Sequence, residues 1–195
     1  MCGRYTANTE DEVIEIRRIL AGLSMRLIGD SLTGDIHGKE VFPSDTAPVI
    51  NKDGVLTLSK WGFEKWDGNG LIINARSETA STGRFFSPYV KKGRCIVPAS
   101  SYFEWRKSIG SPSVKYRIGL RDSCGIFMAG LLKHNNDTGN FVVLTKEPED
   151  NISFIHNRMP VLLTHTQIIP WLDGSLDPVE MSQSSVRDIF FEKAV

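Results

Sequence analysis

The chain has 195 residues, of which 41% are hydrophobic and 24% charged, a balance typical of a globular protein with one substantial core. Lysine plus arginine number 23 and aspartate plus glutamate 23, so the formal net charge is zero. A general polyanion binder is usually basic, so any contact with nucleic acid must come from a local patch. Three cysteines without CxxC spacing argue against a disulfide framework and against a zinc site.

The N-terminus and the apolar runs of the chain bear on its expected cellular location. The N-terminus lacks a basic region followed by an apolar run, and no apolar stretch is long enough to span a bilayer. We therefore expect a cytoplasmic protein that does not bind a membrane.

The first predicted element is a helix that begins after Thr9. The sequence Thr9-Glu10-Asp11-Glu12 has the form of a capping box, which satisfies backbone amides at a helix start. Apolar residues then recur at helical spacing, namely Val13, Ile16, Leu20 and Leu23. The stretch 31–39, rich in Gly, Asp and Thr, predicts an exposed loop.

After this loop the pattern becomes that of β-structure. Short apolar and β-branched runs predict strands over 48–50, 55–61, 71–73, 94–97, 114–120, 126–132 and 141–145. The turn residues 135–139 predict a hairpin. Short helices are expected over 147–154 and 167–172, the second kinked or poorly formed because of Pro170. These elements predict an α+β fold in a single compact domain, 1–195, with a curled, barrel-like mixed or antiparallel sheet flanked by a few helices.

Cys2 is the first candidate for chemistry. Removal of Met1 would leave it with a thiol and a free α-amine on adjacent carbons. Both groups are partly in their reactive forms near neutral pH, since their reference pKa values are about 8.5 and about 7.7–8.0. The amine can activate the thiol as a nucleophile, or both can condense with an aldehyde to give a thiazolidine ring. A buried, inert cysteine is an equally good interpretation of position 2.

Three later stretches place polar residues beside apolar ones. The strand at 71–73 ends in Asn74 and Arg76, where either a site or a surface turn is expected. Glu104 lies between two aromatic residues, so it is either a general acid or base of raised pKa or an outward-pointing edge residue. His156 precedes an apolar strand at 159–163, and a lone histidine in such a place is more often structural than catalytic.

Taken together, these stretches resemble the SOS response-associated peptidase (SRAP) family along nearly the whole chain. The motifs that carry the resemblance are Met1-Cys2-Gly3-Arg4-Tyr5-Thr6, Phe42-Pro43, Thr46-Ala47-Pro48, Trp61-Gly62-Phe63 with Trp66, Asn74-Ala75-Arg76 with Glu78-Thr79, Arg94-Cys95-Ile96-Val97-Pro98, Phe103-Glu104-Trp105, Phe127-Met128-Ala129-Gly130-Leu131 and Ile155-His156 with Arg158-Met159-Pro160.

The resemblance implies covalent crosslinking to abasic sites in single-stranded DNA. In this family the N-terminal cysteine, here Cys2, forms a thiazolidine with the opened deoxyribose. Asn74 would hold the α-amine and the sugar, while Glu104 and His156 would move protons in formation and reversal of the link. The remaining DNA contacts implied are phosphate binding by Arg4, Arg76 and Arg158, and a strand path lined by Trp66, Pro43 and Thr145.

The sequence shows no apparent ligands for a metal or an organic cofactor, and we expect a monomer that associates with the nucleoid when it is bound to DNA. Two features depart from the family pattern. Asn157 stands where relatives commonly have Asp, which would lower the pKa of His156 and weaken its proton transfer. The short tail after Trp171 lacks the Pro-rich end of many relatives. Cys95 and Cys124 lie in apolar runs and are expected to be packing residues.

Two alternatives belong to other functional classes. Cys2 could be the nucleophile of an N-terminal-nucleophile peptidase or amidohydrolase, with Asn74 as an oxyanion contact and activity limited to removal of Met1. A non-catalytic single-strand binding module with a structural Cys2 is the third possibility. The three arginines favour a substrate that carries phosphate over a neutral peptide.

Overall fold

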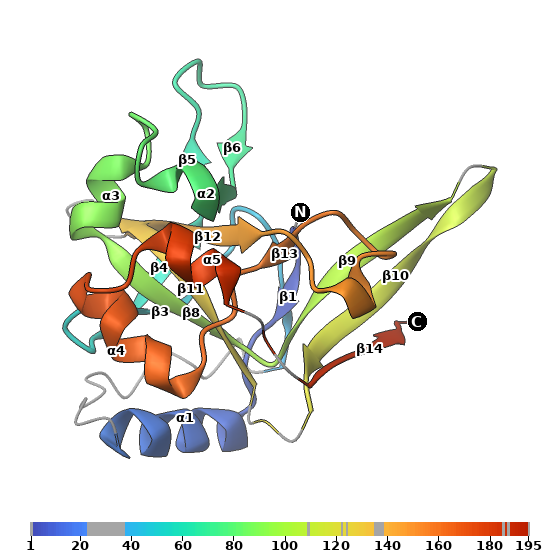
Figure 1. The fold of residues 1–195 in the computed structure, drawn as a ribbon, viewed down its shortest axis with the longest axis horizontal. Helices are drawn as coiled ribbons and strands as arrows, with labels where there is room; N and C mark the ends of the chain where they lie inside the picture. The colour runs from blue at the N-terminus through green and yellow to red at the C-terminus, as the bar shows by residue number, and fades with distance from the viewer. Residues whose placement is uncertain are drawn as a thin grey trace.

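The computed structural model describes residues 2–22, 38–108, 110–121, 123, 125–134, 139–184, 186 and 188–194. At its centre five strands close into a barrel (Figure 1). In order around the barrel they are β11 (Ile126–Lys133), β8 (Arg94–Ala99), β3 (Thr46–Asn51), β4 (Leu56–Trp61) and β12 (Gly139–Lys146). Because β4 and β12 run parallel while the other pairs are antiparallel, the barrel is mixed.

A second, antiparallel sheet adjoins the barrel. Its order is β14 (Ile189–Lys193), β10 (Ser111–Leu120), β9 (Ser101–Ser108), β1 (Tyr5–Thr6) and β2 (Glu40–Val41). The β9–β10 hairpin projects from the barrel as an arm, and β14 lies along it (Figure 1). Tyr5 pairs with Tyr102, so β9 carries the first residues of the chain at the base of this arm.

Short elements complete the fold around the barrel. The strands β7 (Asn74–Arg76) and β13 (Met159–Pro160) both pair with β12, and β5 (Phe63–Glu64) pairs with β6 (Leu71–Ile72) in a separate hairpin. The helices are α1 (Glu10–Gly22), α2 (Ser77–Ala80), α3 (Ser87–Lys92), α4 (His165–Asp173) and α5 (Pro178–Gln183), with a 3₁₀ turn η1 (Asp150–Ile152).

Alternation along the barrel strands produces two hydrophobic cores. In β8, Cys95 and Val97 pack in the core that also contains Cys2, whereas Ile96 packs in the core that contains α4 residues such as Trp171. Successive side chains of a strand point to opposite faces, so a strand with both faces covered is apolar throughout. This explains why every residue of β8 is buried.

The sequence-based prediction of an α+β, barrel-like fold is confirmed. All seven predicted strands are present, and α1 begins with the predicted capping box: Thr9 N donates to Glu12 Oε2 at 2.7 Å and Glu12 N donates to Thr9 Oγ1 at 3.3 Å. Leu23, Cys124 and residues 31–37 and 135–138 lie outside the described part of the chain, but β11 and β12 pair as the predicted hairpin requires.

The helix predicted over 147–154 is wrong. The structure has only the turn η1 there. Pro148 disfavours helical angles at Glu147, and Glu149 has extended backbone angles (φ −65°, ψ 150°), so helical geometry begins only at Asp150. The second predicted helix runs through Pro170 from His165 to Asp173, supported by a capping box between Thr164 and Gln167. The elements that were not predicted include α3, α5 and β14, together with the two-residue strands β2 and β5. None of the helices in the described residues is long and apolar enough to cross a bilayer.

Candidate functional site

Cys2 lies at the start of the chain against the sheet that β1 joins, with its side chain completely buried. Asn74 of β7 donates from Nδ2 to the carbonyl oxygen of Cys2 at 2.8 Å, across 72 positions of sequence. The thiol itself lies 3.7 Å from the carbonyl oxygen of Arg4. Burial raises the pKa of the Cys2 thiol far above its usual range, and the charge of Glu104 acts in the same direction. The sulfur is therefore held as a neutral thiol.

Glu104 reaches Cys2 through the pairing of β1 with β9. Tyr5 pairs with Tyr102, and Phe103 N donates to Arg4 O at 2.9 Å, so the antiparallel register brings Glu104 alongside the first residues of the chain. Its side chain is buried, and this burial raises the pKa of its carboxyl group. The inward orientation rejects the alternative of an outward-pointing edge residue. A raised pKa favours the protonated form of a carboxyl group, which suits it to general acid catalysis.

His156 follows η1 and precedes β13. Its Nδ1 accepts a hydrogen bond from Arg158 N at 3.0 Å, so in the neutral ring Nε2 carries the proton. Burial lowers the pKa of His156, and the nearby positive charge of Lys107 on β9 lowers it further. The charge of the N-terminal amine also lowers this pKa, which places the imidazole near the start of the chain. Asn157 is exposed.

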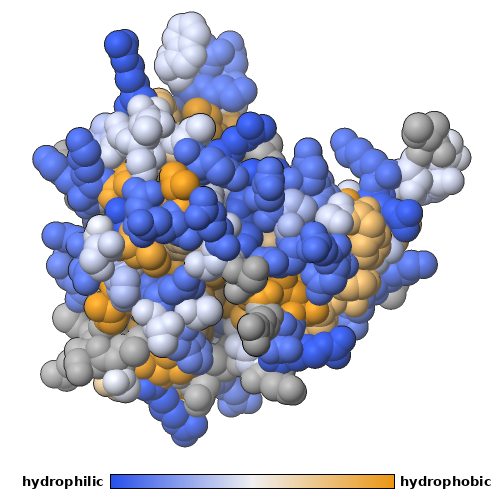
Figure 2. Space-filling model, viewed as in Figure 1, coloured by the Kyte–Doolittle hydropathy of each residue, from blue (hydrophilic) through white to orange (hydrophobic). Residues whose placement is uncertain are grey.

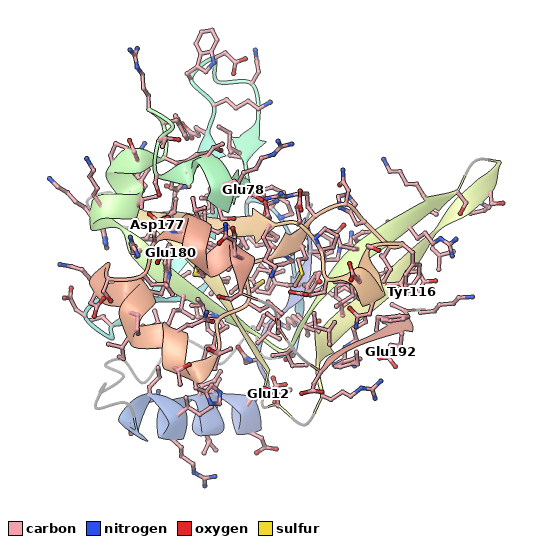
Figure 3. All side chains as sticks on the ribbon, viewed as in Figure 1. Glu12, Glu78, Tyr116, Asp177, Glu180 and Glu192 are labelled. Atoms are coloured by element: carbon pink, nitrogen blue, oxygen red, sulfur yellow. The ribbon has the colours of Figure 1, made fainter. Side chains whose placement is uncertain are left out.

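Arg158 is held inside the protein by an ion pair. Its Nη1 and Nη2 donate to the two carboxylate oxygens of Glu78 at 2.7 and 2.8 Å, and Nη2 also donates to Thr145 O at 2.5 Å. Figure 3 shows Glu78 beside the edge of β12. Burial would raise the pKa of Glu78, but the hydrogen bonds and charge of Arg158 outweigh it and lower that pKa. Both terminal nitrogens of the Arg158 guanidinium are thus already hydrogen-bonded to a carboxylate.

The other predicted DNA contacts occupy different surroundings. Arg4 stacks on Phe42 at 4.2 Å and on Trp105 at 5.0 Å, and it pairs with Glu40 at 3.2 Å. Arg76 is exposed at the end of β7. Trp66, in the connection between β5 and β6, is 93% exposed. Pro43 is half-buried in the turn before β3, whereas Thr145 is fully buried and its hydroxyl donates to Ala75 O at 3.3 Å.

The structure therefore gathers Cys2, Asn74, Glu104 and His156 on one side of the barrel. The model of the SOS response associated peptidase (SRAP) family matches residues 1–192. The chain belongs to the SRAP family.

Individual SRAP relatives agree with this assignment. The chain is 34% identical over 202 residues to a Bacillus subtilis protein named abasic site processing protein YoqW, covering 96% of this chain and 87% of that protein. It is 30% identical over 128 residues to the Escherichia coli abasic site processing protein YedK, covering 63% of this chain and 57% of the relative. A crystal structure of a Bacteroides thetaiotaomicron protein has the same fold, with a TM-score of 0.76 at 22% identity over 98% of this chain and 91% of that one.

Sequence reasoning missed two residues beside the candidate SRAP site. The hydroxyl groups of Tyr5 and Tyr102 are buried in the core that contains Cys2, and neither has a hydrogen-bond partner among the described residues. Burial raises the pKa of both phenols. The sequence did contain a signal for Tyr102, because residues 102 and 104 of one strand share a face. Tyr5 is brought to the same place by its pairing with Tyr102.

The described residues also bear on metal chemistry. They contain no group of three or more His, Cys, Asp or Glu side chains placed to hold a metal ion. The cysteines at 2 and 95 are both free and buried, and the burial of Cys95 in β8 agrees with its predicted packing role.

Proposed function

We propose that this SRAP protein processes abasic sites in single-stranded DNA by linking them covalently to Cys2 once Met1 has been removed. The observation that carries the proposal is the hydrogen bond from Asn74 to the backbone of Cys2, next to the buried carboxyl group of Glu104. Such a bond fixes residue 2 where its amine and thiol lie beside a proton donor. Relatives named abasic site processing proteins, over almost the whole chain in one case, support the choice of substrate.

The first step joins the α-amine of Cys2 to the aldehyde of the ring-opened deoxyribose. The nitrogen attacks C1′, and loss of water leaves an imine. Glu104 suits this step because its buried carboxyl group lies beside Cys2 and its raised pKa favours the protonated form, which can donate to the departing oxygen. Asn74 holds the carbonyl group of the same residue, and alignment of this kind lowers the entropic cost of the reaction.

The second step closes the ring. The thiol of Cys2 adds across the imine, a sulfur–carbon bond forms, and the electrons of the double bond move to nitrogen, which is protonated. The thiol is neutral, so a base must accept its proton. Glu104, left as a carboxylate after the first step, accepts it, while the Nε2–H of the neutral His156 assists as a hydrogen-bond donor. The sum of both steps is an aldehyde plus an aminothiol giving a thiazolidine and water, and it needs no oxidant or metal.

The surrounding residues divide into DNA contacts and supports. Arg4, Arg76, Trp66 and Pro43 offer cationic or stacking surface to a strand that crosses the site. Arg158 and Thr145 support the site from the interior. Arg158 pairs with Glu78 of α2 and donates to Thr145 O of β12, and both contacts hold the His156 segment in place.

The test is the intact mass of the purified protein, alone and after incubation with single-stranded DNA that carries one abasic site. Loss of Met1 and a denaturation-resistant adduct, absent in Cys2→Ser, is the expected result. A protein that loses Met1 and forms no adduct would contradict the proposal. Because Cys2 and a nearby amide donor also suit a peptidase, peptide substrates are then tested on the same protein.

A further inference from the structure

Two phenylalanine rings are exposed at the base of the β9–β10 arm. Phe154, just after η1, is 44% exposed, and Phe191 of β14 is 39% exposed. Their ring centroids are 5.3 Å apart, and both rings contact Tyr116 of β10 edge-on, at 5.9 and 6.2 Å. Figure 3 labels Tyr116 and Glu192 in this region, and Figure 2 shows apolar surface between the barrel and the arm. We name Phe154, Phe191 and Tyr116 the aromatic shelf.

The aromatic shelf is continuous with the candidate site. Tyr116 pairs directly with Glu104, so their side chains lie on the same face of the sheet. Phe154 stands two residues before His156 in the same loop. A DNA strand with its abasic sugar between Cys2 and Glu104 therefore meets the aromatic shelf next, if it continues along this face of the sheet.

Basic side chains accompany the aromatic shelf. The guanidinium of Arg106 lies 5.5 Å from the ring centroid of Phe154. Arg106 is exposed, as is the next residue, Lys107, whose charge acts on His156. Exposed aromatic faces beside cations are the surface that binds single-stranded nucleic acid, since bases stack on the rings and phosphates meet the cations.

We propose that the aromatic shelf stacks the base next to the abasic nucleotide on one side of the lesion, with Arg106 contacting its phosphate. This inference rests on the proposed function. We assign a nucleobase as the ligand of the aromatic shelf, because the shelf adjoins the proposed sugar site and has a positive charge at its edge. It also gives the C-terminal strand a part in DNA binding, through Phe191.

The test uses oligonucleotides with a tetrahydrofuran abasic analogue, which has no aldehyde and binds reversibly. One set extends only 5′ of the analogue and the other only 3′. Phe154→Leu and Phe191→Leu keep apolar bulk but remove the aromatic face. Base stacking is worth enough for each to raise Kd by about 5- to 100-fold for one polarity, with the other unchanged. The matched control is Phe190→Leu, on the same strand, whose ring lies over Arg117 on the opposite face.

A second readout locates the base directly. 5-Iodouracil placed next to the analogue on the affected side should photo-crosslink to peptides that contain residue 154 or 191, and peptide mass mapping identifies them. Equal Kd values for the shelf variants and the wild type on both polarities would overturn the inference, as would photo-adducts elsewhere. A change in self-association by sedimentation, with DNA binding unaltered, would assign the surface to a second copy instead.

The outcome for the proposed function is read separately, from adducts of the wild type with a true abasic site. Adduct formation with no effect of the shelf variants defeats the inference alone. Absence of an adduct defeats the proposed function, whatever the binding data show.

Discussion

Arg158 and Glu78, 80 positions apart, face each other in a two-pronged ion pair with donor–acceptor distances of 2.7 and 2.8 Å. The arginine side chain is 12% exposed, and the same guanidinium reaches the carbonyl of Thr145. A paired, largely buried arginine is costly to leave without its partner. This pair therefore sets where the His156 segment lies relative to β12.

The first prediction concerns the stability that this pair contributes. Glu78→Gln should lower the free energy of unfolding by about 1–2 kcal/mol, because two charge-assisted hydrogen bonds lose their charge. Urea denaturation measures it, and Glu192→Gln is the control, since its pair with Arg117 is exposed and worth under about 1 kcal/mol. The lowered pKa of Glu78 means that the difference is present above pH 4.5 and is lost as pH falls through the folded-state pKa. Equal losses in the two variants would contradict this.

The second prediction separates phosphate contacts from supports. Arg76→Ala should reduce the slope of log K against log salt for single-stranded DNA by about 0.7, the value of one neutralised phosphate. Arg158→Ala should leave the slope unchanged, because its guanidinium already serves Glu78. Titrations at several salt concentrations give both slopes. A reduced slope for Arg158→Ala would show that DNA displaces the carboxylate.

The third prediction concerns Glu104 and pH. A carboxyl group whose folded-state pKa is raised stabilises the fold fully below its unfolded pKa of 4.5, and this contribution is lost as pH rises through the folded-state value. Glu104→Gln should therefore be more stable than the wild type at pH 7, with the gain shrinking toward pH 4.5, while adduct formation slows. Thermal melts at both pH values test the stability. A gain independent of pH would contradict the assigned ionisation.

The fourth prediction concerns Trp66. A side chain 93% exposed contributes little to packing, so Trp66→Ala should change the free energy of unfolding by no more than about 0.5 kcal/mol. If the ring stacks on a base, Kd for single-stranded DNA should rise by about 5- to 100-fold. Fluorescence anisotropy measures the binding. The matched control is Ile14→Ala on α1, also exposed, for which Kd should not change.

The fifth prediction concerns Asn74. Asn74→Ala removes the donor to the Cys2 carbonyl and should slow adduct formation at least about 10-fold through loss of alignment. Asn140→Ala is the control, because Asn140 donates similarly to Gly62 O at 2.9 Å but stands outside the site. Both variants should lose about 1–3 kcal/mol of stability. Single-turnover kinetics measure the rate of adduct formation in both variants. Equal rates in the two variants would show that Asn74 has only a structural role.

The sequence alone determined the features that depend on near neighbours. The capping box of α1, the alternation of the barrel strands and the paired amine and thiol of a trimmed Cys2 all follow from residues a few positions apart. The motifs around Cys2, Asn74, Glu104 and His156 were also enough to indicate the family. The short helix expected at 147–154 did not take account of the proline near its start.

Tertiary structure decided the relations between distant residues. Arg158 was expected at the DNA, but the pairing of β12 with β7 and β13 brings Glu78 to it and buries Thr145 behind the site. The aromatic shelf joins residues of the loop after η1, of β10 and of β14, which no local pattern connects. Strand register is a property of the whole sheet, so the partner of each side chain is settled only when the barrel closes.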